Sequence, residues 1–324
     1  MPEPQARIVF MGTPEFAIPT LEKLVERYRV VGVVTQPDRP AGRGRRLVAS
    51  PVKEFAVAEG IPVLQPVRVR SEEAVEQLQA WRPEIIVVAA YGQILPPSVL
   101  AIPPLGVLNV HASLLPRWRG ASPIQGALLA GDEVTGVTIM KLDEGMDTGP
   151  LLASRETPIA ADETAGELEE RLAQLGAELL MEVLPMYLDG QLEPHPQPEA
   201  GVTLTRPLRT SDARLDWTAT AACVHNRVRA FSPVPGAYTT LDDVRLKVLQ
   251  SQVLDKDDRP TLPADAIPGT TFLYGDLPAV VTGEGALALL YVQMAGKRPM
   301  DGGAFVRGRK DFVGAVLGSP QPGA

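Results

Sequence analysis

The sequence predicts an α/β domain with a Rossmann-like, mostly parallel sheet, followed by a small β-barrel domain. Apolar runs at residues 7–12, 30–35 and 84–90 are continuous, a pattern typical of strands buried on both faces. Helical segments separate these runs, and such alternation favours a parallel sheet covered by helices. From residue 207 the pattern changes to short alternating runs separated by turn residues, which is typical of a barrel.

Local signals predict where the first helices begin. Thr13 precedes Pro14, and this pair favours a capped helix start directly after the first strand. Ser50 predicts the cap of a helix that runs to residue 60, and Ser71 predicts the cap of another that runs to residue 81. No Gly-x-Gly-x-x-Gly pattern follows the first strand, so the sequence does not favour a dinucleotide-binding site.

Domain boundaries follow from one long helix and one proline-rich stretch. Residues 164–189 carry leucines at helical spacing and predict a long amphipathic helix. Residues 190–206 contain three closely spaced prolines and predict a proline-rich linker. We therefore expect an α/β domain at 1–189, a linker at 190–206 and a second domain at 207–324, because 324 residues suffice for two cores.

Two polar residues mark the strand predicted at residues 107–110. Asn109 and His111 are two positions apart, so on a strand both side chains leave the same face. Such a pair is more often simply hydrogen-bonded. The loop at 113–120 favours chemistry instead, because ligands of open α/β sheets bind at the carboxyl ends of strands. An amide donor beside an imidazole suits a reaction in which a carbonyl oxygen gains charge while a proton moves.

An acidic loop at residues 142–150 supplies a third candidate. Gly145 and Gly149 permit a tight fold-back that would aim Asp147 at the strand carrying His111. An aspartate in a turn usually only stabilises the turn. Beside His111, however, its carboxylate would orient the imidazole and assist proton transfer.

A basic loop is predicted at residues 36–50, where prolines and glycines argue against regular structure. Arg39, Arg43, Arg45 and Arg46 stand there against a single acid, Asp38. A run of charges is usually a solvated surface, but loops of this length are often functional. The glycines on both sides of Arg43 would let its backbone and side chain approach a phosphate or a base closely.

Four motifs carry a resemblance to a known family. The segments NVHASLLP at 109–116 and DEGMDTGP at 143–150 resemble the folate-dependent formyltransferases. The segments at 117–124 and 36–44 are similar to the members that formylate methionyl initiator tRNA. The resemblance implies transfer of a formyl group from 10-formyltetrahydrofolate to the α-amine of that tRNA. It also implies that Asn109, His111 and Asp147 are the catalytic residues.

The resemblance further implies where the substrates bind. Folate would contact the turn and the loop formed by Tyr91, Gly92, Ser113, Leu114, Leu115 and Pro116. The basic loop would enter the acceptor end of the tRNA, with Arg43 as its deepest contact. The second domain would resemble an OB fold, a frequent oligonucleotide surface. No metal is implied. The same catalytic residues would also serve a formyltransferase that acts on a small amine, which stays as the alternative.

Composition limits the remaining function classes. The net charge of −8 argues weakly against a nucleic-acid partner, although local basic patches can still bind RNA. The single cysteine, Cys223, excludes an intrachain disulfide, and the few His and Cys residues do not favour a structural zinc site. The sequence shows neither a signal peptide nor a run of about 20 apolar residues. We expect a cytoplasmic monomer without a membrane partner.

Overall fold

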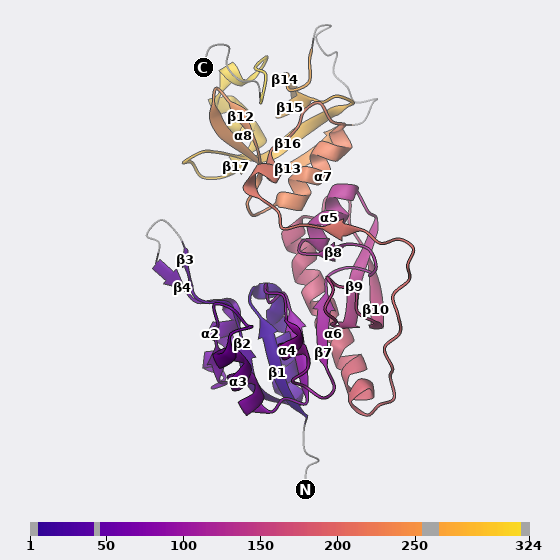
Figure 1. Ribbon diagram of the computed structural model, residues 1–324. Helices are drawn as coiled ribbons and strands as arrows, with labels where there is room; N and C mark the ends of the chain where they lie inside the picture. The colour runs from indigo at the N-terminus through magenta and orange to yellow at the C-terminus, as the bar shows by residue number, and fades with distance from the viewer. Residues whose placement is uncertain (1–5, 42–45, 255–265, 319–324) are drawn as a thin grey trace. The chain divides into compact units, whose positions relative to one another are not determined.

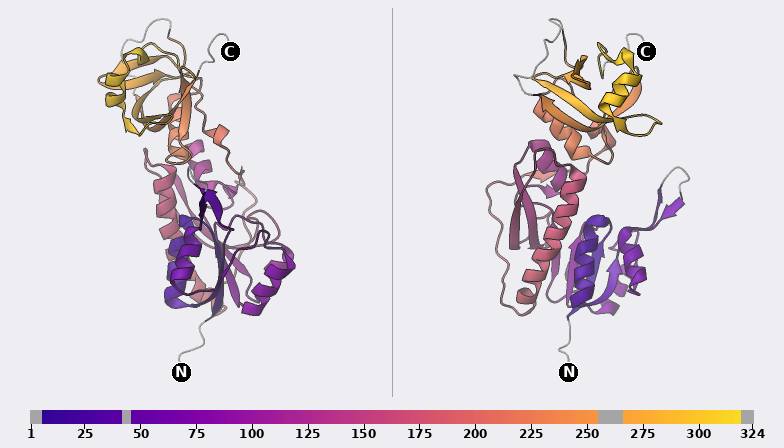
Figure 2. Two further views of the ribbon diagram at one scale, coloured as in Figure 1. Left: turned by 90° about the vertical axis from the view of Figure 1, so that its left-hand side faces the viewer. Right: turned by 180° about the vertical axis from the view of Figure 1, so that it is seen from behind.

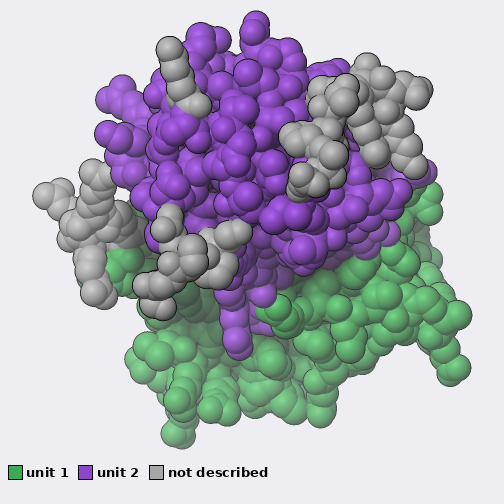
Figure 3. All heavy atoms as spheres, turned by 90° about the horizontal axis from the view of Figure 1, so that it is seen from above, with its two compact units in different colours: residues 1–123, 134–158, 169–206 green, residues 124–133, 159–168, 207–324 purple. Residues whose placement is uncertain are grey.

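The computed structural model describes residues 6–41, 46–254 and 266–318. The chain divides into two compact units, coloured green and purple in Figure 3. Unit 1 contains residues 1–123, 134–158 and 169–206, and unit 2 contains residues 124–133, 159–168 and 207–324. The two short segments of unit 2 come from the part of the chain that the sequence pattern placed in the first domain.

Unit 1 is built on a seven-stranded sheet with the order β10-β9-β7-β6-β1-β2-β5. Figure 1 labels β1, β2, β7, β9 and β10 of this sheet. Five neighbouring strands run parallel, and two further strands, each paired antiparallel to its neighbour, extend one edge. The parallel strands are β1 (Arg7–Gly12), β2 (Arg29–Val34), β5 (Val63–Leu64), β6 (Ile85–Ala89) and β7 (Val107–His111); the antiparallel ones are β9 (Val134–Lys141) and β10 (Leu151–Pro158). The expected mostly parallel α/β sheet is confirmed.

Helices cover both faces of this sheet (Figure 2). They are α1 (Ile18–Arg27), α2 (Pro51–Ala58), α3 (Glu72–Trp81), α4 (Pro97–Leu100) and α6 (Ala165–Leu188), of which α6 belongs to unit 1 from residue 169 onward. On one face Val9 and Met11 of β1 share a core cluster with Leu78 of α3 and Val99 of α4. Burial of such aliphatic side chains stabilises the layered arrangement.

The helix caps agree with the sequence at two of three positions. The side chains of Ser50 and Ser71 accept backbone N–H groups at the starts of α2 and α3, as predicted. The predicted Thr13 cap is wrong. The first helical turn is a short 3-10 helix (Glu15–Ala17) without a side-chain cap, and the Thr13 hydroxyl instead donates to the Tyr91 carbonyl at 2.9 Å. A tertiary hydrogen bond has replaced the local one.

The basic loop is partly regular, contrary to expectation. Strands β3 (Arg39–Ala41) and β4 (Arg46–Val48) pair antiparallel in a hairpin. The pairing is short enough to tolerate a proline, which is allowed on an edge strand. Asp38 lies just before it, and hydrogen bonds from Gln65 and Lys53 hold the pKa of its carboxyl below the ordinary value. Arg43 and Arg45 lie outside the described residues.

Unit 2 is an antiparallel β domain with helices. Its sheet has the order β12-β13-β16-β15-β14, with β17 also paired to β16. The strands are β12 (Ala237–Leu241), β13 (Val244–Leu254), β14 (Thr271–Tyr274), β15 (Leu277–Val281), β16 (Ala286–Met294) and β17 (Met300–Asp301); the helices are α5 (Pro123–Ala130, in unit 2 from residue 124), α7 (Ala221–Phe231) and α8 (Gly302–Gly308). Within the described residues no pairing joins β12 to β14, so the predicted barrel is not seen to close.

Helix α7 buries a polar cluster inside unit 2. His225 is 8% exposed, and its Nδ1 and Nε2 atoms lie 3.0 Å from Ser251 Oγ and 3.3 Å from the Ala161 carbonyl. Arg229 donates from Nη1 to the carbonyls of Ala160 and Glu163. The segment 159–168 therefore provides acceptors for two buried side chains of α7, which accounts for its place in unit 2.

The close approach of α6 to β7 generates a stability prediction. A Cβ atom at Gly176 would lie 2.5 Å from Val110 Cγ1, so we expect Gly176→Val to force the helix and strand apart. Overpacking of this kind lowers the free energy of unfolding by about 1–3 kcal/mol. Urea unfolding measures the change, with Gln174→Val, at an exposed position of the same helix, as the control. Equal unfolding free energies for the two variants would contradict the tight packing.

Burial of His225 generates a pH prediction. Desolvation lowers the pKa of His225 below its ordinary value of about 6.5, and the nearby Arg229 acts in the same direction, while the Ala161 carbonyl and Asp162 oppose both. Below that pH the unfolded chain binds a proton that the native His225 binds less readily. The free energy of unfolding should therefore fall as the pH drops from 7.5 to 5.5.

The matched variants isolate this contribution. His225→Gln should weaken the pH dependence of the free energy of unfolding, whereas His195→Gln, at an exposed histidine, should leave it as in the wild type. The measurement is urea unfolding at both pH values. A wild-type slope retained in His225→Gln would assign the pH dependence to other groups.

Candidate active site

Strand β7 carries the two polar residues at the centre of the site. Asn109 and His111 are 9% and 6% exposed. The strand is flanked by β6 and β9, with Asn109 opposite Met140 and His111 opposite Thr138. Both side chains are therefore set on a strand that is hydrogen-bonded along both edges, which limits their movement.

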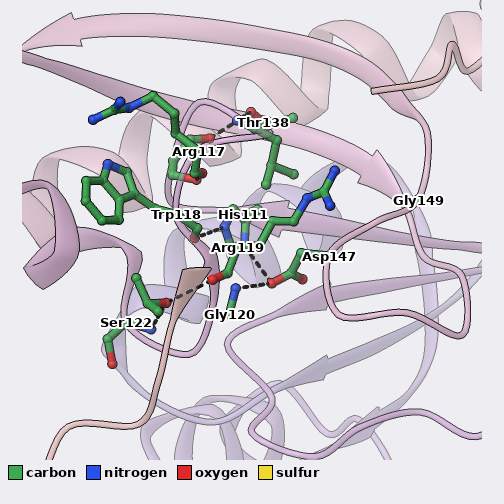
Figure 4. Close-up of polar contacts among 12 residues, drawn as sticks. His111, Arg117, Trp118, Arg119, Gly120, Ser122, Thr138, Asp147 and Gly149 are labelled. Atoms are coloured by element: carbon green, nitrogen blue, oxygen red, sulfur yellow. Dashed lines mark hydrogen bonds and ion pairs between the residues drawn. The ribbon is translucent and has the colours of Figure 1, made fainter. Parts of the chain in front are cut away.

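The acidic loop folds back onto this strand, as its glycines predicted. The Leu142 N–H donates to the Val107 carbonyl, so the loop starts beside the amino end of β7 and must return along it to reach His111. At Gly149 a side chain would collide with the Lys141 carbonyl, so only glycine permits this path. The Asp147 Oδ2 atom then lies 3.8 Å from His111 Nδ1 (Figure 4).

Asp147 is held by a second contact at the same oxygen. The Gly120 backbone N–H donates to Asp147 Oδ2 at 2.7 Å, and the Asp147 side chain is 17% exposed. Asp147 has a φ of +52°, in the left-handed region that non-glycine residues seldom adopt. The carboxylate is thus fixed by tertiary contacts in a backbone conformation that is costly without them.

The contact of the other ring nitrogen of His111, Nε2, indicates which tautomer the neutral imidazole adopts. Nε2 lies 3.1 Å from the Trp118 carbonyl, which can only accept, so we assign the proton to Nε2. In the neutral ring Nδ1 is then the acceptor, and it faces the Asp147 carboxylate. Nδ1 is therefore the ring atom that could accept a proton in a reaction, with the Asp147 carboxylate 3.8 Å away to stabilise the imidazolium.

The loop after β7 presents its backbone more than its side chains. Thr138 Oγ1 donates to the Ser113 carbonyl and accepts the Leu115 N–H, while Ser113 Oγ donates to the Arg117 carbonyl. Ser113 is fully buried, and Leu115 packs with Met140 and Leu151. Leu114 and Pro116 are partly exposed. Any ligand contact of Ser113 or Leu115 would therefore use main-chain groups.

The turn after β6, at Tyr91 and Gly92, also presents main-chain groups more than side chains. The Tyr91 side chain is 2% exposed in the core, and burial raises the pKa of its hydroxyl. Its carbonyl accepts from Thr13 and Gln36, while Gly92 is exposed. An open hollow of about 460 Å³ adjoins the turn. The hollow is lined by Arg68, Val69, Arg70, Gln93, Ile94 and Pro96.

The arginine hairpin follows β2, the strand next to β1 in the sheet. Arg39 Nη2 donates to Gln36 Oε1 at 3.4 Å, and Leu47 beside it is 70% exposed. Strands β2 and β7 run in the same direction. The hairpin that follows β2 therefore begins at the carboxyl ends of the strands, where β7 ends with His111. Arg46 lies on β4, and Arg43 and Arg45 lie outside the described residues.

Sequence reasoning missed a set of residues in the stretch expected to be a linker. Gln197, Thr203 and Thr205 all make side-chain hydrogen bonds to the loops of the site. A second hollow, of about 570 Å³, lies between Arg119 and this stretch. Alternating prolines at 194, 196 and 198 indicate an extended chain and were the one available signal.

The described part of the chain contains neither a membrane helix nor a cluster of metal ligands. No helix there is long and apolar enough to cross a membrane. Nor do three or more His, Cys, Asp or Glu side chains gather there as a metal site would require.

Comparison with known proteins gives matches over both units. The formyl transferase family matches residues 6–184, and the formyl transferase C-terminal domain family matches residues 207–310. The chain is 50% identical over 314 residues to the methionyl-tRNA formyltransferase of Roseiflexus sp. (strain RS-1), covering 96% of this chain and 95% of the relative. It is 50% identical over 309 residues to that of Halorhodospira halophila, covering 94% and 97%.

Solved structures show the same fold at lower identity. The N-formyltransferase of Helicobacter canadensis, in complex with folinic acid and dTDP-3-aminofucose, gives a TM-score of 0.64 at 15% identity, covering 89% of this chain and 99% of that one. HypX from Aquifex aeolicus in complex with tetrahydrofolic acid gives 0.62 at 17% identity, covering 95% and 47%. At these identities the likeness concerns the fold alone.

Proposed function

The chain belongs to the formyl transferase family, and on this premise we propose that it transfers the formyl group of 10-formyltetrahydrofolate to the α-amine of methionyl initiator tRNA. The family expected from the sequence motifs is confirmed. Relatives named methionyl-tRNA formyltransferase cover nearly the whole chain at about half identity, which supports the tRNA substrate. The observation that carries the chemistry is the approach of Asp147 Oδ2 to His111 Nδ1 at 3.8 Å.

In the proposed reaction a neutral amine attacks the formyl carbon. The new C–N bond forms as the carbonyl π electrons move to oxygen, which gives a tetrahedral oxyanion and an ammonium group. The Asn109 amide donates a hydrogen bond to the oxyanion. Donors of this kind are worth about 2.7–4 kcal/mol of transition-state stabilisation, so the proposal invokes no metal.

Proton transfer completes the reaction. The Asp147–His111 pair accepts the ammonium proton, directly or through a water, with Nδ1 as the basic atom of the ring. The pair then returns a proton to the folate nitrogen, whose bond to carbon breaks as the carbonyl re-forms. The Nε2–H bond to the Trp118 carbonyl supports this assignment, because it keeps the acceptor nitrogen on the side of Asp147.

We propose that the folate binds through main-chain groups of the turn and the loop beside this pair. The buried side chains of Tyr91, Ser113 and Leu115 favour backbone contacts, while Gly92 is open to solvent. Leu114 and Pro116 complete the proposed surface. HypX in complex with tetrahydrofolic acid has the same fold, which is consistent with a folate-linked donor.

We also propose that the hairpin arginines and unit 2 bind the tRNA. Arg39, Arg43, Arg45 and Arg46 would contact the acceptor end through phosphates and bases. Unit 2 would offer an OB-like surface to the RNA, for which its antiparallel sheet gives partial support. The protein would act as a cytoplasmic monomer.

A transfer assay tests the proposal and separates it from its alternative. Radiolabelled 10-formyltetrahydrofolate is mixed with charged initiator tRNA, charged elongator tRNA or an amino-sugar nucleotide. Label on the initiator tRNA alone is the expected result. Label on the amino sugar would keep the formyl chemistry but assign the enzyme to small amines, and no label on any acceptor would reject formyl transfer.

We expect a loss of kcat of about 10²- to 10⁴-fold in each of the variants Asn109→Ala, His111→Ala and Asp147→Ala. Each of them removes an oxyanion donor or a proton-transfer group. Single-turnover formyl transfer measures the loss, and thermal unfolding checks the fold. His195→Ala is the control, since that histidine is exposed. A His111→Ala enzyme with wild-type turnover would refute the mechanism.

We expect Arg39→Ala and Arg43→Ala to raise KM for tRNA by about tenfold, the effect of losing one phosphate or base contact, without changing KM for the folate. The salt dependence of KM should weaken in parallel. Arg29→Ala, at the opposite end of β2, is the control. Equal losses toward both substrates would contradict the assignment of the hairpin to RNA.

A further inference from the structure

Residues 195–205, which we call the strap, lie in the predicted linker, run along unit 1 and are attached to it. His195 and Leu151 exchange two backbone hydrogen bonds, at 2.8 and 2.9 Å. Strand β11 (Leu204–Thr205) pairs parallel with β8 (Arg119–Gly120). The strap is therefore fixed to unit 1 at both ends, and its middle lies over the loops of the active site.

Gln197 in the strap forms hydrogen bonds to these loops through both the nitrogen and the oxygen of its side-chain amide. Its Nε2 donates to the carbonyls of Asp147 and Gly149, each at 2.8 Å. Its Oε1 accepts from Nε and Nη2 of Arg119, at 3.1 and 2.7 Å. A primary amide has two N–H donors on one side and one oxygen on the other, so glutamine matches this arrangement in both directions.

The contact matters because Asp147 is in a conformation that it does not favour. Its φ of +52° needs support from outside the loop, and Gln197 binds the carbonyls on either side of Thr148. Through Arg119 the same amide also fixes the residue before Gly120, whose N–H holds the Asp147 carboxylate. Gln197 thus restrains both the aspartate and its hydrogen-bond donor.

Thr203 restrains the other side of His111. Its Oγ1 accepts the Trp118 N–H at 2.7 Å, and its carbonyl accepts the Arg119 N–H at 3.0 Å. Trp118 has a φ of +59°, and its carbonyl is the group facing His111 Nε2. Both partners of the imidazole ring, Asp147 and the Trp118 carbonyl, are therefore held in unfavourable backbone conformations by strap residues.

We propose that Gln197 and Thr203 are positioning residues that set the separation and orientation of the His111–Asp147 pair. They contact neither substrate in this assignment and act through the two loops. The kinetic part of the inference rests on the proposed formyl transfer. Misplacement of a catalytic group by 1 Å can lower a rate by about 10²-fold, which is the scale of effect that the strap would control.

The first test is a set of paired variants at each position. Gln197→Ala and Gln197→Glu should both lower kcat, by about 10- to 100-fold, with KM for either substrate within about twofold. Gln197→Glu is informative because it keeps an acceptor for Arg119 but loses both donors. Thr203→Val should behave likewise, whereas Thr203→Ser, which keeps the hydroxyl, should restore kcat. Gln191→Ala, an exposed glutamine outside the strap, is the control.

A double-mutant cycle separates positioning from a general structural role. If Gln197 acts through Asp147, then Gln197→Ala should change kcat less than about twofold in an Asp147→Asn background. The same fold loss in both backgrounds would overturn the inference, as would a loss confined to KM.

An NMR measurement on the protein without substrate tests the positioning role independently of formyl transfer. The chain has three histidines, so the imidazole ¹H–¹⁵N spectrum is simple enough to assign. Gln197→Ala should shift the His111 ring signals, and Gln191→Ala should not. Unchanged His111 signals in Gln197→Ala would overturn the positioning role even in an active enzyme. A wild-type enzyme without formyl transfer would reject the proposed function and leave this spectrum to decide the inference.

Discussion

The hydrogen bond from the Gly120 N–H to the Asp147 carboxylate joins the two loops on which the site depends. It links the loop after β7 directly to the loop between β9 and β10, beside His111. A bond from a backbone amide to a partly buried carboxylate is charge-assisted and correspondingly strong. It fixes the anion beside His111, and the proposed order of proton transfers follows from that placement.

The sheet explains why such a bond is needed. Strand β9 runs antiparallel to β7, so the loop leaving β9 starts at the wrong end of β7 for an encounter with His111. The chain must double back over several residues, and it does so through Gly149 and an aspartate with positive φ. Regular secondary structure supplies Asn109 and His111, whereas Asp147 arrives only through irregular backbone that has to be stabilised from elsewhere.

The sequence was informative where structure is local. Continuous apolar runs predicted the parallel strands, and Ser50 and Ser71 predicted helix starts, because those signals act within a few residues. Thr13 misled because its hydroxyl bonds Tyr91, 78 residues away. The hairpin around Arg39 was hidden by its short strands and its proline. The prolines around Gln197 indicated an extended chain but not its contacts, since its partner Arg119 lies 78 residues earlier in the chain.

The three chain segments that make up unit 2 limit where the protein could be divided in a gene fusion. The unit joins residues 124–133 and 159–168 to the main block that begins at 207, so the chain passes between the two units more than once. A fusion protein that began at residue 207 would contain α7 but not Ala160 and Glu163. The buried Arg229 would then lose the two carbonyls to which its Nη1 donates. A C-terminal block that begins at residue 207 would therefore lack part of the buried polar cluster of its own unit.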